Sequence, residues 1–272
     1  MIIDILNIIL PFAYFALTVL YGIHFFSDEI HVEKYLTPVL ITVLLIHAVD
    51  LGLRTVYFMH FPTASPAEVL TVIAFAMGLI YLWIESILSV KTTGMFVFAL
   101  MTIFQTISSA TISYIQDINP ILQSPLFAMH TGSAILGYSS LAISAMYALL
   151  YLLLFYDIKG SRFSVIYNKL PSLELLDAMN TKAAIAGFTF LSITILLGVI
   201  WTQIAFQKFL IFDWKIAVAF FSWFIFGIVV LSKHILGWSG KRIAYFSLTG
   251  FASIMVSLTV VNYLLTTFHK FH

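Results

Sequence analysis

The sequence has no cysteine and few charged residues. Because none of the 272 residues is cysteine, the chain forms no disulfide, no thiolate-ligated iron–sulfur cluster and no covalent CxxCH haem attachment. Any metal or cofactor must therefore be held by histidine, by carboxylate or by packing. Charged residues make up 9% of the chain and the formal net charge is +1, so no basic patch indicates a nucleic-acid partner.

Apolar residues dominate what is present. They account for 61% of the chain, and the mean hydropathy is +1.05, which is more than a soluble core requires. The apolar runs do not alternate every two residues, which predicts helices, because backbone groups in lipid must pair within one segment. We expect an all-α polytopic membrane protein with about eight transmembrane helices in one bundle. The expected spans are Ile5–Phe26, Pro38–Met59, Pro66–Leu88, Met95–Tyr114, Pro125–Tyr156, Ala183–Phe206, Trp214–Leu236 and Ile243–Phe268.

The spans follow one another without an internal repeat or a long linker, so residues 1–272 are expected to form a single integral-membrane domain. The first span lacks the basic leader and cleavage site of a signal peptide. The fifth outruns the length that a bilayer needs and is expected to continue beyond it. With both termini outside, the inner side receives most of the basic residues, as is typical of membrane proteins. These are Lys34, Lys91, Lys159, Arg162, Lys169, Lys182, Lys233, Lys241 and Arg242.

Several histidines fall at predicted helix ends on the outer side. His60 ends the second span, His130 opens the fifth, and His269 and His272 follow the eighth. A haem iron takes two axial donors on opposite faces of a flat ring, and neutral imidazole suits it. These histidines are therefore candidate ligands. The alternative is that each is an ordinary interfacial residue.

Polar residues also form a stripe inside the second span. His47, Asp50 and Arg54 are spaced three and four residues apart, which places them on one helix face. Ionised groups at this depth are costly, so the face must point into the bundle or toward water. Asp50 and Arg54 are expected to pair. His47 either satisfies a neighbouring group or forms a second ligand pair with His234, near the inner end of the seventh span.

Two further patterns concern packing. Small residues recur along the fifth span (Ser133, Gly137, Ser140) and the sixth (Gly187, Gly198), which predicts close helix packing. The basic loop between them, 157–182, contains leucines at one-sided spacing over 170–177. We expect a short in-plane helix there.

Four segments, in this order, resemble the CcsA/CcmC cytochrome c assembly superfamily and its HemX- and YpjD-like members. The similarity covers most of the chain from about Leu44, over residues 44–268. The segments are Arg54 with His60-Phe61-Pro62 and Glu68; Met129-His130 with Gly137-Tyr138-Ser139; Leu170-Pro171-Ser172-Leu173-Glu174-Leu175-Leu176-Asp177 with Gly187-Phe188; and Asp213-Trp214-Lys215 with Trp223 and Gly237-Trp238-Ser239-Gly240-Lys241.

The resemblance implies haem handling during maturation of c-type cytochromes. By position, His130 and His269 correspond to the histidines that flank the family's tryptophan-rich outer segment, and His234 matches a later helix histidine loosely. His47 corresponds to a histidine of HemX-like members. The outer segment itself is reduced here to Trp201, Asp213 and Trp214.

Three functions follow from these patterns. The first is a haem-handling membrane protein that binds non-covalent b-type haem through histidine pairs and supports c-type cytochrome biogenesis. The second is a HemX-like regulator or assembly scaffold without obligatory haem, and the third is a proton or small-solute transporter. No arrangement of nucleophile, base and oxyanion donors indicates an enzyme. Expected partners are membrane lipid, other maturation proteins and an apocytochrome. The expected location of the protein is the bacterial cytoplasmic membrane.

Overall fold

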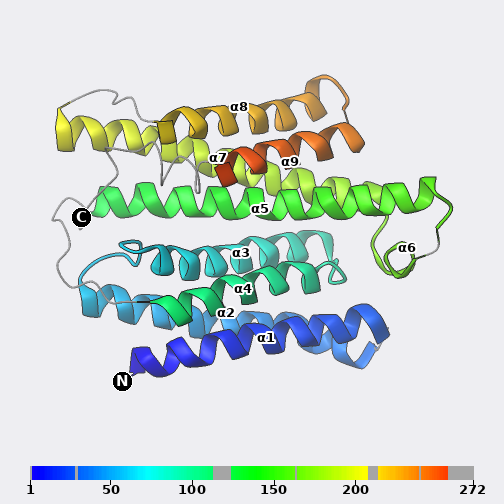
Figure 1. The fold of residues 1–272 in the computed structure, drawn as a ribbon, viewed down its shortest axis with the longest axis horizontal. Coiled ribbons are helices and arrows are strands. Elements are labelled where there is room, and N and C mark those ends of the chain that lie inside the picture. The colour runs from blue at the N-terminus through cyan, green and yellow to red at the C-terminus, as the bar shows by residue number, and fades with distance from the viewer. Residues whose placement is uncertain are drawn as a thin grey trace. The chain divides into compact units, whose positions relative to one another are not determined.

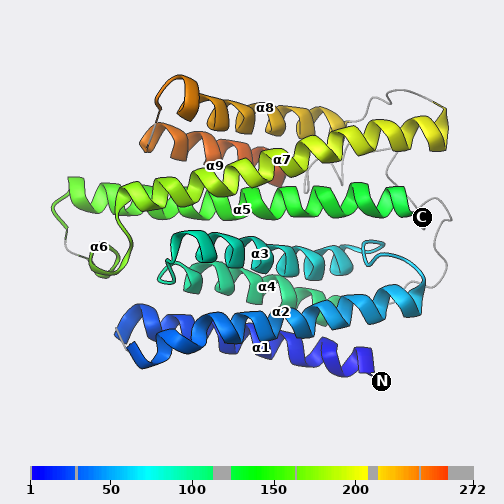
Figure 2. The same ribbon diagram turned by 180° about the vertical axis from the view of Figure 1, so that it is seen from behind.

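The structure is a computed structural model that describes residues 2–27, 30–112, 124–162, 164–207, 214–238 and 240–256 (Figures 1 and 2). Within these ranges all regular secondary structure is helical, which confirms the predicted all-α class. The helices are α1 (Ile2–Ser27), α2 (Ile30–Phe58), α3 (Pro66–Leu88), α4 (Gly94–Thr111), α5 (Pro125–Lys159), α6 (Val165–Lys169), α7 (Leu173–Phe206), α8 (Trp214–Ile235) and α9 (Lys241–Val256).

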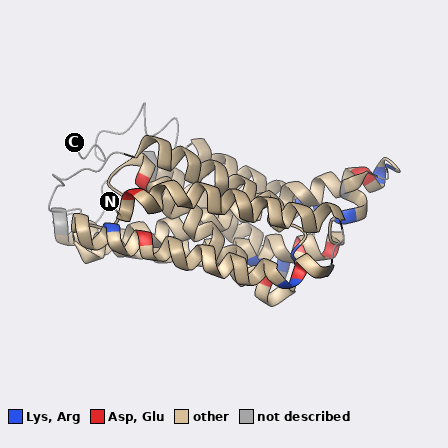
Figure 3. Cartoon of the chain, turned by 90° about the horizontal axis from the view of Figure 1, so that it is seen from below, with Lys and Arg blue, Asp and Glu red and all other residues tan. Residues whose placement is uncertain are grey.

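The chain is a polytopic helical membrane protein. Seven of the described helices, namely α1 to α5, α7 and α8, are long and apolar enough to cross a membrane. The eighth predicted span, Ile243–Phe268, corresponds to α9 as far as Val256, and the rest of it lies outside the described residues. Lysine, arginine, aspartate and glutamate occur mainly near helix ends, with long uncharged stretches between them (Figure 3).

Serine caps define the starts of α3 and α5. Ser65 and Ser124 each accept a hydrogen bond, at 3.2 Å, from a backbone N–H in the first turn of the helix that follows. Pro66 and Pro125 occupy the next position, where a missing N–H costs nothing. Both starts agree with the predicted spans. The predicted extension of the fifth span is also confirmed, because α5 has 35 residues, or about 52 Å.

The larger differences from the predicted boundaries concern the segment before α7 and the start of α2. The in-plane helix over 170–177 is wrong, since α6 ends at Lys169 and Leu173 already begins α7. Ser172 accepts the N–H of Leu175 and starts α7 there, with no helix breaker before the apolar span. The second span begins earlier than Pro38, because the helix includes the polar residues from Ile30. Pro38 lies inside α2, as Pro11 lies inside α1; transmembrane helices tolerate such prolines.

The contacts divide the chain into two compact units. Unit 1 comprises Met1–Gln123 with Ser161–Pro171, and unit 2 comprises Ser124–Gly160 with Ser172–His272. In unit 1, α1 packs against α2 and α4, and α3 packs against α4 and α2. In unit 2, α5 packs against α7 and α9, and α8 packs against the same two helices. The single domain expected over residues 1–272 stays a prediction.

The small residues of unit 2 bring α5 and α7 close together. A Cβ at Gly187 would collide with the Leu141 side chain and lie 3.3 Å from the carbonyl oxygen of Gly137. Only glycine permits this approach, as the small-residue stripes predict. The buried apolar cluster beside it comprises Leu141, Ala184, Leu191, Phe226, Val229, Ile243 and Ile254.

Candidate functional site

His47 lies in a hydrogen-bonded chain that crosses unit 1 from α1 to α4. The Tyr14 hydroxyl lies 2.8 Å from His47 Nδ1, and His47 Nε2 lies 2.9 Å from Thr71 Oγ1. The Thr71 hydroxyl donates to Gln105 Oε1 at 2.8 Å. Because the proton of Thr71 is used there, Nε2 must donate to Thr71, and Nδ1 accepts from Tyr14. His47 is fully buried, with both ring nitrogens in hydrogen bonds.

This arrangement bears on the predicted ligand role of His47. Iron ligation by either ring nitrogen would require one of the two hydrogen bonds to break. The structure describes the backbone of its suggested partner His234 within α8, but the His234 side chain lies outside the described residues. The His47–His234 pair therefore stays a prediction.

Asp50 and Arg54 form an ion pair inside the same unit. Arg54 Nε donates to Asp50 Oδ2 at 2.7 Å, and both side chains are at most 2% exposed. Arg54 Nη2 also donates to Asn7 Oδ1 at 3.1 Å, and Asn7 Nδ2 donates to the carbonyl of Ser109 at 3.1 Å. The pair thus connects α2 to α1, and through Asn7 to α4.

His60 and Glu68 lie together between α2 and α3. His60 Nδ1 is 2.8 Å from the carbonyl oxygen of Phe61, which only accepts, so Nδ1 carries the proton. The buried Nε2 has no hydrogen-bond partner and faces Glu68 Oε1 at 4.0 Å. The other oxygen of Glu68 accepts the N–H groups of Ala64 and Ser65 in a capping box. The capping box fixes the loop that carries His60.

His130 occupies the second turn of α5 in unit 2. Its Nδ1 is 3.0 Å from the carbonyl oxygen of Thr194 in α7, so Nδ1 carries the proton and the lone pair is on Nε2. This is the tautomer of a histidine whose Nε2 ligates a metal while the other nitrogen is held in place. The ring is half-buried and stacks against Trp201, with centroids 6.3 Å apart and planes 11° apart.

Gly198 leaves space for this ring. A Cβ at residue 198 would lie 2.9 Å from His130 Cε1, closer than side-chain carbons normally approach. The Thr194 hydroxyl also donates to Ser133 Oγ at 3.0 Å, which joins α7 to α5 next to the histidine. Three positions one turn apart on α7 (Thr194, Gly198 and Trp201) thus orient His130.

A sequence-family model described as "Cytochrome C assembly protein" matches residues 68–269, well over half of the chain. The chain belongs to this cytochrome c assembly protein family. The match begins at Glu68 and ends at His269, so it contains His130 and the outer tryptophan segment. His47, Asp50, Arg54 and His60 precede it.

Relatives of the family agree with this assignment. A protein named cytochrome c biogenesis protein CcsA from Guillardia theta is 25% identical over 242 residues, which cover 81% of this chain and 80% of that protein. The CcsA protein of Chlamydomonas reinhardtii is 28% identical over 221 residues, covering 78% of this chain and 61% of that protein. That of Cyanophora paradoxa is 23% identical, covering 96% of this chain and 94% of that protein.

Several predicted site residues lie outside the described residues. These are His269 and Asp213, together with the side chain of Trp214, whose backbone begins α8. The pairing of His130 with His269 and the composition of the outer tryptophan segment therefore stay predictions. Trp201, the other member of that segment, is buried against His130 and Phe127.

The structure adds a polar cluster that sequence reasoning missed. Lys233 Nζ in α8 donates to Asp177 Oδ2 at 2.6 Å and to Thr181 Oγ1 at 3.0 Å, both in α7. Asp177 Oδ1 accepts the backbone N–H of Gly240 at 2.9 Å. This cluster fixes the loop between α8 and α9. The sequence feature that could have indicated this cluster is the presence of oppositely charged residues at the ends of two apolar runs, where unpaired charges are costly.

A second missed residue is Glu85 in α3, which is buried in unit 1. Its carboxyl group accepts hydrogen bonds from the hydroxyls of Tyr21, at 2.8 Å, and Thr37, at 2.5 Å. An acidic residue inside an apolar run indicates such neighbours in general. The sequence does not reveal that hydroxyls, rather than a cation, supply them.

Proposed function

We propose that the protein is a haem-handling integral membrane protein that supports c-type cytochrome biogenesis. Membership of the cytochrome c assembly family supports the biogenesis role. The structural observation that carries the haem assignment is the orientation of His130, whose Nδ1 proton is engaged by a backbone carbonyl. Neutral imidazole in this tautomer is the form that haem iron takes as an axial ligand.

The residues around His130 hold its imidazole in one orientation. The ring stands at the start of a helix and is only half-buried, with the indole of Trp201 parallel to it. Gly198 keeps the edge of the imidazole clear of a side chain. His130 would hold b-type haem together with His269, and haem here is cargo to be passed on to an apocytochrome.

The proposal includes no bond chemistry by the chain itself. Its expected partners are other cytochrome c maturation proteins and an apocytochrome. We place it in the bacterial cytoplasmic membrane with both termini outside, because that orientation agrees with the distribution of lysine and arginine.

A second candidate is a HemX-like scaffold or regulator that does not require haem. The observation in its favour is the reduced outer segment, since the sequence from Trp201 to Trp214 contains only these two tryptophans. A surface with so few indoles offers less contact to a porphyrin than a tryptophan-rich one.

The absorption spectrum of the purified full-length protein supplied with haem tests the proposal. We expect a Soret band and, after reduction, the sharp α and β bands of six-coordinate haem. His130→Ala should remove them by deleting an axial donor. His31→Ala, an exposed histidine at the start of α2, is the matched control and should retain them. A wild-type protein that stays colourless would favour the scaffold.

A further inference from the structure

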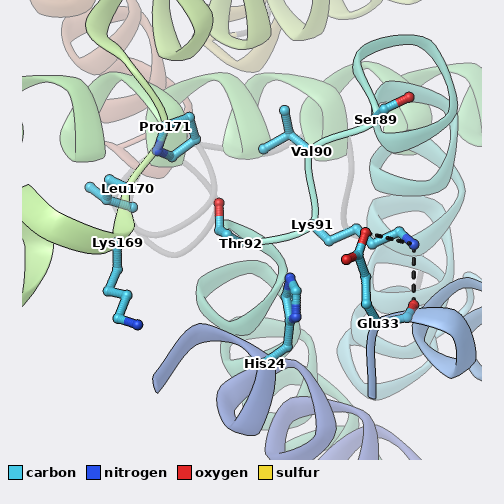
Figure 4. A pocket seen from close by; sticks show the side chains of 9 residues that line it. All are labelled: His24, Glu33, Ser89, Val90, Lys91, Thr92, Lys169, Leu170 and Pro171. Carbon is cyan, nitrogen blue, oxygen red and sulfur yellow. Dashed lines mark hydrogen bonds and ion pairs between the residues drawn. The ribbon is translucent and has the colours of Figure 1, made fainter. Parts of the chain in front are cut away.

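A pocket of about 300 Å³ lies at one end of unit 1, and none of its lining residues belongs to the sites described above (Figure 4). It is formed where α1 ends, α2 begins, the α3–α4 loop turns and the segment after α6 passes. The lining residues are His24, Glu33, Ser89, Val90, Lys91, Thr92, Lys169, Leu170 and Pro171.

Helix length places this pocket near the level of lipid headgroups. The 26 residues of α1 span about 39 Å and the 23 residues of α3 about 34 Å, against about 30 Å of hydrocarbon. Both helices are therefore longer than the hydrocarbon is thick, and the pocket lies at an end of each, so we assign it to the level of the headgroups. The predicted orientation assigns this end to the inner side, where anionic lipids attract basic residues.

The charge of the lining favours an anion. Two ammonium groups, those of Lys91 and Lys169, line the pocket against one carboxylate, that of Glu33. Lys91 Nζ lies 3.7 Å from Glu33 Oε1 and also donates to the Glu33 carbonyl at 3.2 Å. The Glu33 side chain is 48% exposed, so this ion pair is weak and leaves Lys91 able to serve a stronger anion.

The lining also contains an imidazole and a hydroxyl group that can donate hydrogen bonds to an anion. His24 Nδ1 is buried without a hydrogen-bond partner, and the ring extends toward Thr92 in the middle of the view (Figure 4). Thr92 lies just before α4, whose N-terminus carries the positive end of the helix dipole. The lining also contains the apolar side chains of Val90, Leu170 and Pro171, which neighbour the two lysines in the chain.

Cations, an unpaired imidazole nitrogen and apolar side chains at headgroup depth together suit one type of ligand. We propose that this pocket binds a single phosphate group, carried by an anionic phospholipid whose glycerol and upper acyl chain lie along Val90 and Leu170. Soluble phosphate offers the same charged group but makes no use of the apolar side chains in the lining. The proposal does not depend on haem binding.

Native mass spectrometry of the full-length protein in neutral detergent tests this with phosphatidylglycerol and phosphatidylcholine. We expect one phosphatidylglycerol to be retained in preference to phosphatidylcholine. Lys91→Gln and Lys169→Gln should each weaken its binding about fivefold, as expected for one basic residue near an anionic headgroup. Lys34→Gln is the matched control, because Lys34 is exposed on α2 near Glu33 but does not line the pocket.

A further variant separates binding from folding. Glu33→Gln removes the carboxylate that competes for Lys91, so phosphatidylglycerol should bind more tightly, a gain that misfolding does not produce. Equal losses in Lys34→Gln and Lys91→Gln, or equal retention of the two lipids, would overturn the proposal. Titration with inorganic phosphate identifies the source: phosphate binding with the same variant pattern but no phosphatidylglycerol retention would overturn the lipid assignment.

Discussion

Two buried polar regions of the molecule treat their histidines differently. In unit 1, His47 bonds through both ring nitrogens to hydroxyl groups of neighbouring helices, and the Asp50–Arg54 pair beside it is equally enclosed. In unit 2, His130 is half-buried at a helix start, and a backbone carbonyl engages its Nδ1. The first environment connects helices, whereas the second orients an imidazole.

This difference teaches that the role of a histidine in an apolar run depends on its hydrogen-bond partners rather than on its depth in the membrane. Thr71 orders the protons around His47, so a positive charge or a metal there would disturb bonds across four helices. The Thr194 carbonyl accepts the Nδ1 proton of His130, which places the lone pair of the ring on Nε2. Substitutions in each of the two units can test this comparison.

The largest effect is expected from opening the ion pair of unit 1. Asp50→Ala leaves the Arg54 charge buried beside a missing partner, which should lower the free energy of unfolding by about 3–5 kcal/mol. SDS titration of the purified protein, followed by circular dichroism, measures this. The double variant Asp50→Ala/Arg54→Met removes both charges and should recover most of the loss. A single variant as stable as wild type would show that the pair contributes little.

Removing the histidine of unit 1 should have the next largest effect. His47→Phe leaves the Tyr14 hydroxyl without its acceptor, at a cost of about 1–3 kcal/mol in the same titration. Tyr14→Phe and the double variant complete a cycle that isolates the coupling between the two side chains. We expect the haem spectrum to persist in His47→Phe. Should it disappear as in His130→Ala, the sequence-based prediction of His47 as a ligand is correct.

A smaller change tests the orientation of His130 without removing it. Gly198→Ala places a Cβ against the imidazole, so the ring must move away from Thr194. Loss of such a supporting contact should weaken haem affinity about tenfold, measured by haem titration. Gly132→Ala, which meets nothing within 4 Å near the same end of α5, is the control. Equal affinities in the two variants would contradict an orienting role for Gly198.

Single cysteine substitutions that test the membrane orientation of the chain should have the smallest effect on the structure. Because the chain has no cysteine, single cysteines report without background. Asp4→Cys, in the first turn of α1, should react with a membrane-impermeant maleimide in intact spheroplasts. Arg162→Cys, after α5, should react only once the membrane is opened. The reverse pattern would place both termini inside.

Much of the fold follows from the sequence, because lipid leaves few alternatives. Continuous apolar runs must be helical, and proline after serine sets a helix start, so α3 and α5 begin where predicted. The start of α7 was missed because the leucine spacing over 170–177 fits an in-plane helix and the first turns of a long one equally well. The Ser172 cap decides between them.

The site was predictable only in part. Spacing along one helix put Asp50 and Arg54 on one face, and the two do pair. The groups that determine which ring nitrogen of His47 and of His130 carries the proton are Thr71 and the Thr194 carbonyl, which are remote in sequence. No local pattern encodes such contacts, because they depend on how separate helices pack. The same reason hid the link between Lys233 and Asp177.

Pro11 gives one of these contacts a further consequence. Proline has no N–H, so the carbonyl of Asn7, four residues earlier in α1, receives no helical bond from residue 11. The first turns of α1 are thus joined to the rest of that helix less firmly than an unbroken backbone would join them. The Asn7 side chain compensates through two hydrogen bonds: it accepts one from Arg54 and donates one to the Ser109 carbonyl. Amide hydrogen exchange should therefore be faster in the first turns of α1 when these two hydrogen bonds of Asn7 are broken.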